Sequence, residues 1–314
     1  MPKTKFCVGL SDISDSYMGC IIDDWGVLHD GEDAFPEAVN TLKSLKERHK
    51  HIIILTNDRK TALEKKAQLK KMKIGPSLYQ NIVTPVELVR QGLIAQDKDF
   101  FKDIGEKAYL FTHDGDTSIL DDTGVEAVED INDADFVMMM GMAYPRRTLE
   151  SYEDDIKVAI KKRLTAICLN QDSRGLIGTN FLVGPALLAR RYEDSGGIVN
   201  YVGKPHSYIY RHCVEILQEK EIYPAHTVMF GDTMAHDVIG ANTMALDTCL
   251  FKSGLHAANF MHCENLKEVD NALKNLIVQY NNVMPTYLAD EMAWGNALPD
   301  RKHKKRKLPK RKKS

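Results

Sequence analysis

The sequence has 314 residues, which exceeds the size that a single hydrophobic core usually serves, so we expect one larger and one smaller domain. Hydrophobic residues make up 43% and charged residues 27%, as in globular proteins, and no apolar run approaches the roughly 20 residues that cross a bilayer. The start of the chain also lacks the apolar stretch of a secretory signal, and we therefore expect a cytoplasmic protein.

The formal charge of −2 hides an asymmetry between the body of the chain and its end. Residues 301–314 contain ten Lys and Arg and no Asp or Glu, which leaves −12 on residues 1–300. Like charges without apolar partners cannot bury enough surface to offset the entropy of ordering, so we predict a disordered tail. Contact with nucleic acid, contact with an acidic membrane and a nuclear-import role stay open, because charge alone does not choose between them.

The first predicted elements form a β-α-β unit. The apolar run 19–22 ends abruptly in Asp23-Asp24, as a buried parallel strand does at its carboxyl end. Pro36 stands at a favoured first helical position, and apolar residues follow it at helical spacing. A second apolar run at 52–55 then leads into Thr56-Asn57. This order predicts two parallel strands joined by a helix, with polar side chains at their carboxyl ends.

The middle of the chain predicts a second α/β module, with edges near residues 85 and 200. Apolar runs at 108–112, 136–140 and 166–169 predict short strands, and a helix between them carries one apolar face formed by Leu149, Tyr152, Ile156 and Ile160. The segment after the last of these strands could present Asp172 or Arg174 to a substrate, and a solvated loop is an equal alternative.

A second β-α-β unit near the other end repeats the architecture of the first. Apolar residues at helical spacing follow Gly203-Lys204-Pro205, and the strand 228–230 leads into Gly231-Asp232. We therefore predict an α/β protein whose parallel sheet is built from both ends of the chain.

Four short motifs at these strand ends and helix starts carry groups suited to phosphoryl transfer. The carboxylate of Asp23 can attack phosphorus covalently, which splits one difficult transfer into two easier ones. Thr56-Asn57 offers a hydroxyl and an amide to phosphoryl oxygens, and Lys204 offers a positive charge. Asp232 and Asp237 are hard carboxylates suited to an octahedral Mg²⁺ that keeps several waters.

In the order and spacing of these motifs the sequence resembles the haloacid dehalogenase superfamily, and within it the 4-nitrophenylphosphatase-like branch of subfamily IIA. The resemblance covers nearly the whole chain and includes segments at 81–85, 192–197 and 240–242. It implies a Rossmann-like parallel-sheet core with a smaller inserted α/β cap. We accordingly expect core at 1–84 and 201–300, the cap at 85–200 and the tail at 301–314.

The resemblance also implies a role for each motif residue. Asp23 would be the nucleophile that forms an aspartyl-phosphate and would also bind Mg²⁺. Thr56 and Asn57 would hold the phosphoryl group, and Lys204 would neutralise it. The two carboxylates of the last motif, Asp232 and Asp237, would bind Mg²⁺ directly or through water.

The first motif departs from the family pattern. Most phosphatases of the family read Asp-x-Asp-Gly, whereas Trp25 stands here in place of the second Asp, and an indole cannot exchange a proton with a leaving group. Asp24 does not replace it, since neighbours on an extended strand point to opposite faces, and we expect a buried or capping carboxylate there. The backbone carbonyl of Trp25 remains available to Mg²⁺. Hydrolysis should then favour leaving groups stable as anions, unless Asp24 or a cap residue acts as a surrogate.

These observations favour a Mg²⁺-dependent hydrolase of a small phosphorylated metabolite, either a phosphoric monoester or an acyl phosphate. A catalytically silent binding or scaffold protein with the same fold is the alternative. Dehalogenase chemistry is a third possibility, but a halide site gains nothing from the negative charges of Asp232 and Asp237. His29, His206 and His236 lie beside motifs and could contact a phosphate or be ordinary loop residues. The sequence leaves a homodimer open.

Overall fold

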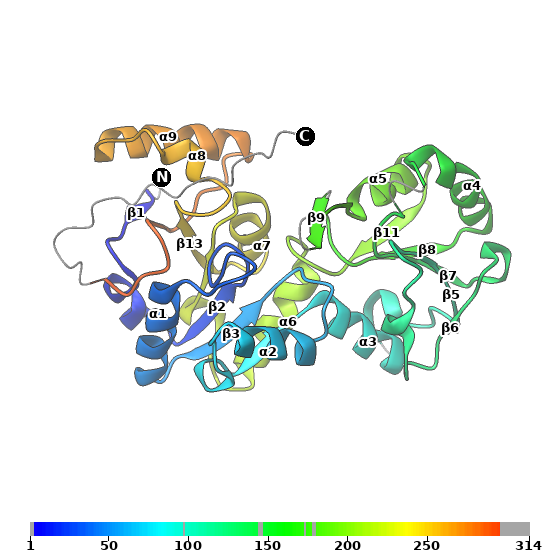
Figure 1. Ribbon diagram of the computed structural model, residues 1–314, viewed down its shortest axis with the longest axis horizontal. Coiled ribbons are helices and arrows are strands. Elements are labelled where there is room, and N and C mark those ends of the chain that lie inside the picture. Colours follow the sequence, from blue (N-terminus) through cyan, green and yellow to red (C-terminus); the bar gives the residue numbers. More distant parts are fainter. Residues whose placement is uncertain (1–2, 97, 144–146, 173, 178–179, 296–314) are drawn as a thin grey trace.

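The computed structural model describes residues 3–96, 98–143, 147–172, 174–177 and 180–295, with the backbone alone for the parts of 174–183 among them. The predicted tail at 301–314 and the side chain of Arg174 lie outside this description. Within the described residues the chain forms two parallel sheets, one in the core and one in the cap, that lie side by side along the longest axis of the molecule (Figure 1).

The larger sheet has seven strands within the described residues, in the order β1-β14-β13-β12-β2-β3-β4, and all pair in parallel. They are β1 (Lys5–Phe6), β2 (Gly19–Asp23), β3 (His51–Leu55), β4 (Asn81–Val83), β12 (Thr227–Gly231), β13 (Asp247–Phe251) and β14 (Tyr287–Ala289). The pairing of β12 with β2 joins the two ends of the chain in one sheet, as predicted. It also places the carboxyl ends of β2, β3 and β12 next to one another.

Helices cover both faces of this sheet because the side chains of its strands alternate. Ile22 packs on one face in a cluster with Leu42 of helix α1, whereas Ile21 packs on the other in a cluster with Ile209 of helix α6. The helices of this part are α1 (Pro36–Glu47), α2 (Ala62–Lys71), α6 (Ser207–Gln218), α7 (Ile239–Asn242), α8 (Ala257–Phe260) and α9 (Leu266–Gln279). The helix predicted from Pro36 therefore begins at that residue.

The smaller sheet has the order β11-β8-β7-β5-β6, also entirely parallel. Its strands are β5 (Lys107–Phe111), β6 (Glu126–Ala127), β7 (Phe136–Met139), β8 (Thr165–Cys168) and β11 (Ile198–Tyr201), and its helices are α3 (Pro85–Ala95), α4 (Glu153–Lys162) and α5 (Ala186–Asp194). The three strands predicted in this part of the chain are confirmed as β5, β7 and β8, each end lying within one residue of its prediction. The α-helix begins only at Glu153, because Leu149–Tyr152 form a 3₁₀ turn. The edges at 85 and 200 stay predictions.

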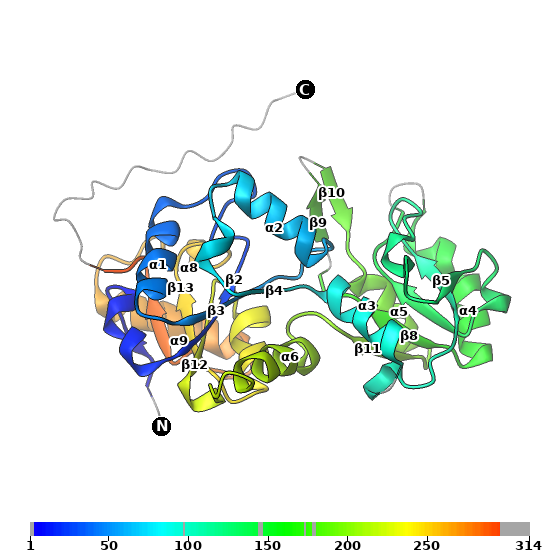
Figure 2. The ribbon, with the colours of Figure 1, turned by 90° about the horizontal axis from the view of Figure 1, so that it is seen from below.

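The segment that follows β8, and precedes the last cap elements α5 and β11, extends towards the core. It forms a hairpin of β9 (Arg174–Ile177) and β10 (Asn180–Val183), which are antiparallel. Figures 1 and 2 agree in placing this hairpin between the two sheets. A part of the cap thus approaches the carboxyl edge of the core sheet.

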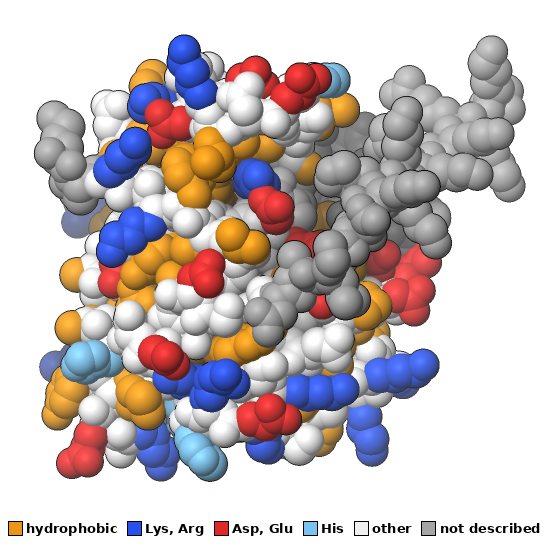
Figure 3. Space-filling model, turned by 90° about the vertical axis from the view of Figure 1, so that its left-hand side faces the viewer, with side chains coloured by type: hydrophobic (Ala, Val, Ile, Leu, Met, Phe, Trp, Pro, Cys, Tyr) orange, Lys and Arg blue, Asp and Glu red, His pale blue; other side chains and the backbone are white. Residues whose placement is uncertain are grey.

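None of the helices in the described part of the chain is long and apolar enough to cross a membrane. On the face of the core shown in Figure 3, acidic and basic side chains are interspersed with small hydrophobic areas. Among the described residues visible on that face, the acidic side chains therefore form no continuous patch.

Candidate active site

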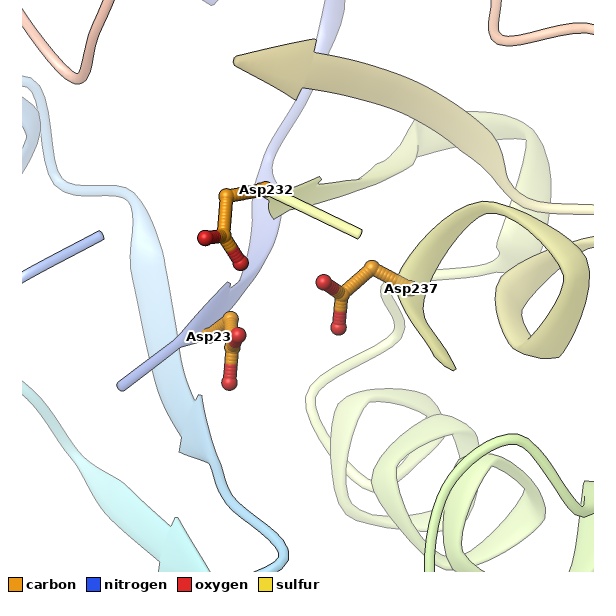
Figure 4. Close-up of side chains that lie close together, drawn as sticks. All are labelled: Asp23, Asp232 and Asp237. Atoms are coloured by element: carbon orange, nitrogen blue, oxygen red, sulfur yellow. The ribbon is translucent and has the colours of Figure 1, made fainter. Parts of the chain in front are cut away.

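Three buried carboxylates meet at the carboxyl edge of the core sheet. Asp23 is the last residue of β2, Asp232 follows β12 directly, and Asp237 lies in a π-helical turn at Met234–Val238. Each offers an oxygen, and these oxygens all lie within 4.8 Å of one another. Figure 4 shows the three side chains pointing towards a common space. The sequence had predicted this set, and the topology brings it together because β2 and β12 are neighbours.

Lys204 joins this cluster from the loop before α6. Its Nζ lies 2.6 Å from Oδ1 of Asp23 and 2.8 Å from Oδ1 of Asp237, and the side chain is almost fully buried. Burial alone would lower the pKa of Lys204, but the charges of Asp23 and Asp237 raise it above its ordinary value. Lys204 is therefore a fixed positive charge beside the predicted nucleophile.

The carboxylates of Asp232 and Asp237 are held by backbone geometry. Oδ2 of Asp237 accepts hydrogen bonds from the backbone N–H and the hydroxyl of Thr233, at 3.0 and 2.7 Å. Oδ2 of Asp232 accepts one from the backbone N–H of Leu255 at 2.9 Å. A Cβ at Gly254, whose φ is +87°, would overlap that carboxylate. The glycine thus lets the loop close over Asp232, and one oxygen of each Asp stays directed at the common space.

The charge balance of this cluster suits a divalent cation. Burial and the neighbouring Asp237 raise the pKa of Asp23 well above its usual range, and the same two causes raise that of Asp232 to about 6. A single lysine faces three carboxylates among the described residues, so their negative charge is not fully compensated by the protein. Three converging hard oxygens fit Mg²⁺, which accepts a few carboxylates together with waters.

Thr56 and Asn57 follow β3, the strand beside β2. Thr56 is buried, and its hydroxyl accepts a hydrogen bond from the backbone N–H of Asp58 at 3.2 Å. The amide of Asn57 bonds the backbone of Lys204 twice, donating to its carbonyl at 3.1 Å and accepting from its N–H at 2.8 Å. Asn57 therefore positions the lysine loop, a role that the sequence did not suggest. Phosphoryl binding by Thr56 and Asn57 stays a prediction.

Asp24 points away from the cluster and is fully engaged elsewhere. It is 1% exposed, and its oxygens lie 2.8 Å from Nε2 of His29 and 2.7 Å from Nζ of Lys65. Burial would raise its pKa, but His29 and Lys65 hold it below the usual range. The expectation of a buried carboxylate is confirmed. Lys65 was not anticipated, because it lies on α2 among several other lysines and its burial depends on the packing of that helix.

The histidines beside the motifs do not share one role. Nδ1 of His29 accepts a hydrogen bond from the N–H of Gly31, so in a neutral ring Nε2 carries the proton and donates to Asp24. This histidine stabilises the loop after β2. His206 stacks on Tyr201, with ring centroids 4.4 Å apart. His236 pairs with Asp172 of the cap, with Nε2 and Oδ1 3.4 Å apart.

The cap contributes side chains to the edge of this site. Asn170 donates from its amide to the backbone carbonyl of Asn57 at 3.1 Å, and its Oδ1 accepts from the backbone N–H of Asp172 at 3.0 Å. Of the two cap residues suggested by the sequence, the structure thus brings Asp172 to the core. Asn170 could not be singled out from sequence, because an amide after a strand is ordinary in a loop.

Trp25, in contrast, faces solvent. It is 53% exposed, and its indole Nε1 would lie 3.1 Å from a Cβ atom placed at Gly31. The side chain that occupies the position of the second Asp therefore packs against its own loop. Binding of Mg²⁺ by its backbone carbonyl stays a prediction.

Comparisons with known proteins agree with this fold. A family model described as haloacid dehalogenase-like hydrolase matches residues 20–126, and one described as HAD-hydrolase-like matches residues 201–276. The chain is 22% identical over 266 residues to the 5'-nucleotidase YutF of Bacillus subtilis, a match that covers 83% of this chain and 96% of that protein.

Solved structures show the same fold at low sequence identity. A hydrolase of the haloacid dehalogenase-like family from Brucella suis matches with a TM-score of 0.71 and 23% identity, over 91% of this chain and 100% of that one. A possible sugar phosphatase of the same superfamily from Cytophaga hutchinsonii matches with a TM-score of 0.71 and 18% identity, over 93% and 99%. Because the two family models together span more than half of the chain and include all four motifs, the chain belongs to the haloacid dehalogenase-like hydrolases.

Proposed function

We propose that this protein is a Mg²⁺-dependent phosphohydrolase that acts on a small phosphorylated metabolite through an aspartyl-phosphate at Asp23. The observation that carries the proposal is the contact of Lys204 with Asp23 and Asp237, at 2.6 and 2.8 Å, beside the carboxylate of Asp232. A nucleophile, a fixed cation and a hard-oxygen metal site are thereby joined in one buried cluster.

The residues of this cluster divide the work of phosphoryl transfer. Asp23 attacks phosphorus, while Lys204 stabilises the negative charge that its oxygens develop. Asp232 and Asp237, with Asp23, would hold Mg²⁺, which supplies further positive charge to the phosphoryl oxygens when it is bound. Since Asp237 already accepts three hydrogen bonds, from Thr233 and Lys204, its share in metal binding is best made through water.

Turnover of a panel of phosphorylated metabolites and of 4-nitrophenyl phosphate, with and without Mg²⁺, tests the proposal. We expect hydrolysis that requires the metal, and a phosphoryl label that is trapped on the protein by acid quench. Asp23→Asn should lose both signals, whereas Asp15→Asn, an exposed aspartate on the same segment, should keep them. Turnover that survives in Asp23→Asn would show that this carboxylate is not the nucleophile.

The metal site has its own test. Asp232→Asn removes one charge from the cluster, and we expect calorimetry to show markedly weaker Mg²⁺ binding by this variant. Unchanged binding would place the metal elsewhere.

One observation favours a second candidate function. Trp25 stands where phosphatases of this family usually carry a proton-exchanging Asp. The second candidate is therefore a binding or scaffold protein that keeps the fold but has lost catalysis. Such a protein would bind Mg²⁺ through Asp232 and yet turn over no member of the panel.

A further inference from the structure

The first motif leaves the proton-transfer role of the proposed reaction unfilled. Trp25 has no exchangeable proton of suitable pKa, and its side chain faces solvent. Asp24 is buried on the other side of the strand and already bonds His29 and Lys65. A proton donor for the leaving oxygen must therefore come from another element.

One carboxylate of the cap lies beside the site without belonging to the metal cluster. Asp172 is on the segment between β8 and the hairpin β9–β10, and its side chain is 28% exposed. Its Oδ1 lies 3.4 Å from Nε2 of His236, the residue directly before Asp237. Its carboxyl also lies close enough to Lys204 and Asp237 for their charges to act on it. Asp172 therefore lies beside the cluster that holds the predicted nucleophile, since Nζ of Lys204 contacts Asp23.

The position of Asp172 is fixed from both domains. Its own N–H is held by Asn170, which also bonds the carbonyl of Asn57 in the core. Its carbonyl accepts a hydrogen bond from the N–H of Ala186, at the start of α5, at 3.4 Å. Because its backbone is held in this way, only the side-chain torsions of Asp172 need further ordering as it approaches a bound phosphate ester.

The charges around Asp172 suit a group that exchanges a proton. Burial raises its pKa above the usual range, Asp237 acts in the same direction, and His236, Lys204 and Asn57 act against them. His206 lies close enough to His236 for their charges to interact, and the buried Cys168 lies close enough to Asp172 for the charge of that carboxylate to act on its thiol. A carboxyl whose pKa is raised gives up its proton closer to neutral pH, where such catalysis is effective.

We propose that Asp172 is the general acid and base of this enzyme and replaces the aspartate missing at Trp25. This inference rests on the proposed phosphohydrolase function. In the first step Asp23 forms a bond to phosphorus, the bond from phosphorus to the ester oxygen breaks, and the carboxyl of Asp172 gives that oxygen its proton. In the second step the carboxylate of Asp172 takes a proton from water as that water attacks phosphorus. The bond between Asp23 and phosphorus then breaks, which releases phosphate and restores the Asp23 carboxylate.

This assignment ties proton transfer to the cap. The nucleophile, lysine and metal ligands all come from the core, whereas the acid arrives with the segment after β8. The catalytic set is therefore complete only while that segment lies on the core. The dependence of turnover on the leaving group should consequently be shallow in the native protein, because an acid is present. It should become steep when Asp172 is neutralised.

The test compares Asp172→Asn with the native protein on phosphates of graded leaving-group pKa, from 4-nitrophenyl to alkyl phosphates. We expect turnover of alkyl phosphates to fall by about 10²–10⁴-fold and that of 4-nitrophenyl phosphate to change far less. Asp121→Asn, an exposed cap aspartate, is the matched control and should leave the whole profile unchanged. A thermal melt and the labelling of Asp23 by 4-nitrophenyl phosphate establish that the variant is folded.

Rescue separates a proton-transfer role from a structural one. Trp25→Asp, introduced into Asp172→Asn, supplies a carboxylate at the usual position and should recover alkyl-phosphate turnover. The inference is overturned if Asp172→Asn matches Asp121→Asn across the panel, or if it loses all substrates equally and is not rescued. Absence of any turnover in the native protein would instead overturn the proposed function, and this inference with it.

Discussion

Replacing Lys65 by methionine tests whether the ion pairs of this buried lysine with Asp24 and Asp58 stabilise the fold. Nζ of Lys65 lies 2.7 Å from Asp24 and 2.6 Å from Asp58, and the lysine side chain is 2% exposed. Methionine keeps much of the apolar stem but removes the charge. Asp24 would then be left buried with His29 as its remaining partner, whereas Asp58, which is 26% exposed, keeps Lys60 at 3.2 Å.

The size of the effect follows from this unequal burial. Removing one partner of a buried ion pair typically costs about 3–5 kcal/mol, because the remaining charge is left without compensation. Asp24 meets that condition, but Asp58 reaches solvent, so we expect the lower end, about 3 kcal/mol. At about 2.1 cal/mol/K of unfolding entropy per residue, the 314 residues of this chain give roughly 1.5 °C per kcal/mol, so Tm should fall by about 4–5 °C.

Denaturant and thermal unfolding of Lys65→Met and Lys66→Met measure the effect. Lys66 is the exposed neighbour on α2, and its replacement should change stability by less than about 0.5 kcal/mol. Adding Asp24→Asn to Lys65→Met removes the uncompensated charge and should recover part of the loss. Equal stability of the two single variants would refute the reasoning that Asp24 depends on Lys65.

The same variant has a predicted pH dependence. Lys65 helps to hold the pKa of Asp24 below its unfolded value of about 4, so this carboxylate stabilises the native state above that pH and loses its effect as the pH falls. Without Lys65, the pKa of Asp24 in the folded state rises. The stability gap between Lys65→Met and the native protein should therefore narrow as the pH falls through the pKa that Asp24 has in the variant.

Two further predictions concern the metal site and the tail. Gly254→Ala should displace the Asp232 carboxylate and weaken Mg²⁺ binding in calorimetry, whereas Gly124→Ala, with a similar φ of +79° and open space around it, should show only the cost of backbone strain; equal binding by both would exclude the steric explanation. Removing residues 301–314 should leave the melting transition intact and reduce retention on heparin or anionic lipid, because the disordered basic tail that the sequence predicts would contribute charge and little packing. Loss of cooperative melting would instead make the tail structural.

The sequence predicted the core sheet and the cluster of three carboxylates because both are encoded locally. Apolar runs that end in Asp23 and Gly231-Asp232 are typical of buried parallel strands with polar carboxyl ends, and the structure confirms those strands. Since parallel strands align their carboxyl ends, the pairing of β2 with β12 is enough to bring these motifs together.

Contacts between distant segments could not be read in the same way. The burial of Lys65, the bridge from Asn57 to Lys204 and the approach of Asp172 to His236 each join elements far apart in the chain. They depend on how α2, the lysine loop and the cap pack on the core, which the periodicity of a single segment does not specify. By itself the sequence therefore determined the fold class and singled out the three carboxylates that meet in one cluster. Only the tertiary structure decided which polar groups lie close to them, because hydrogen-bond partners are set by packing in three dimensions.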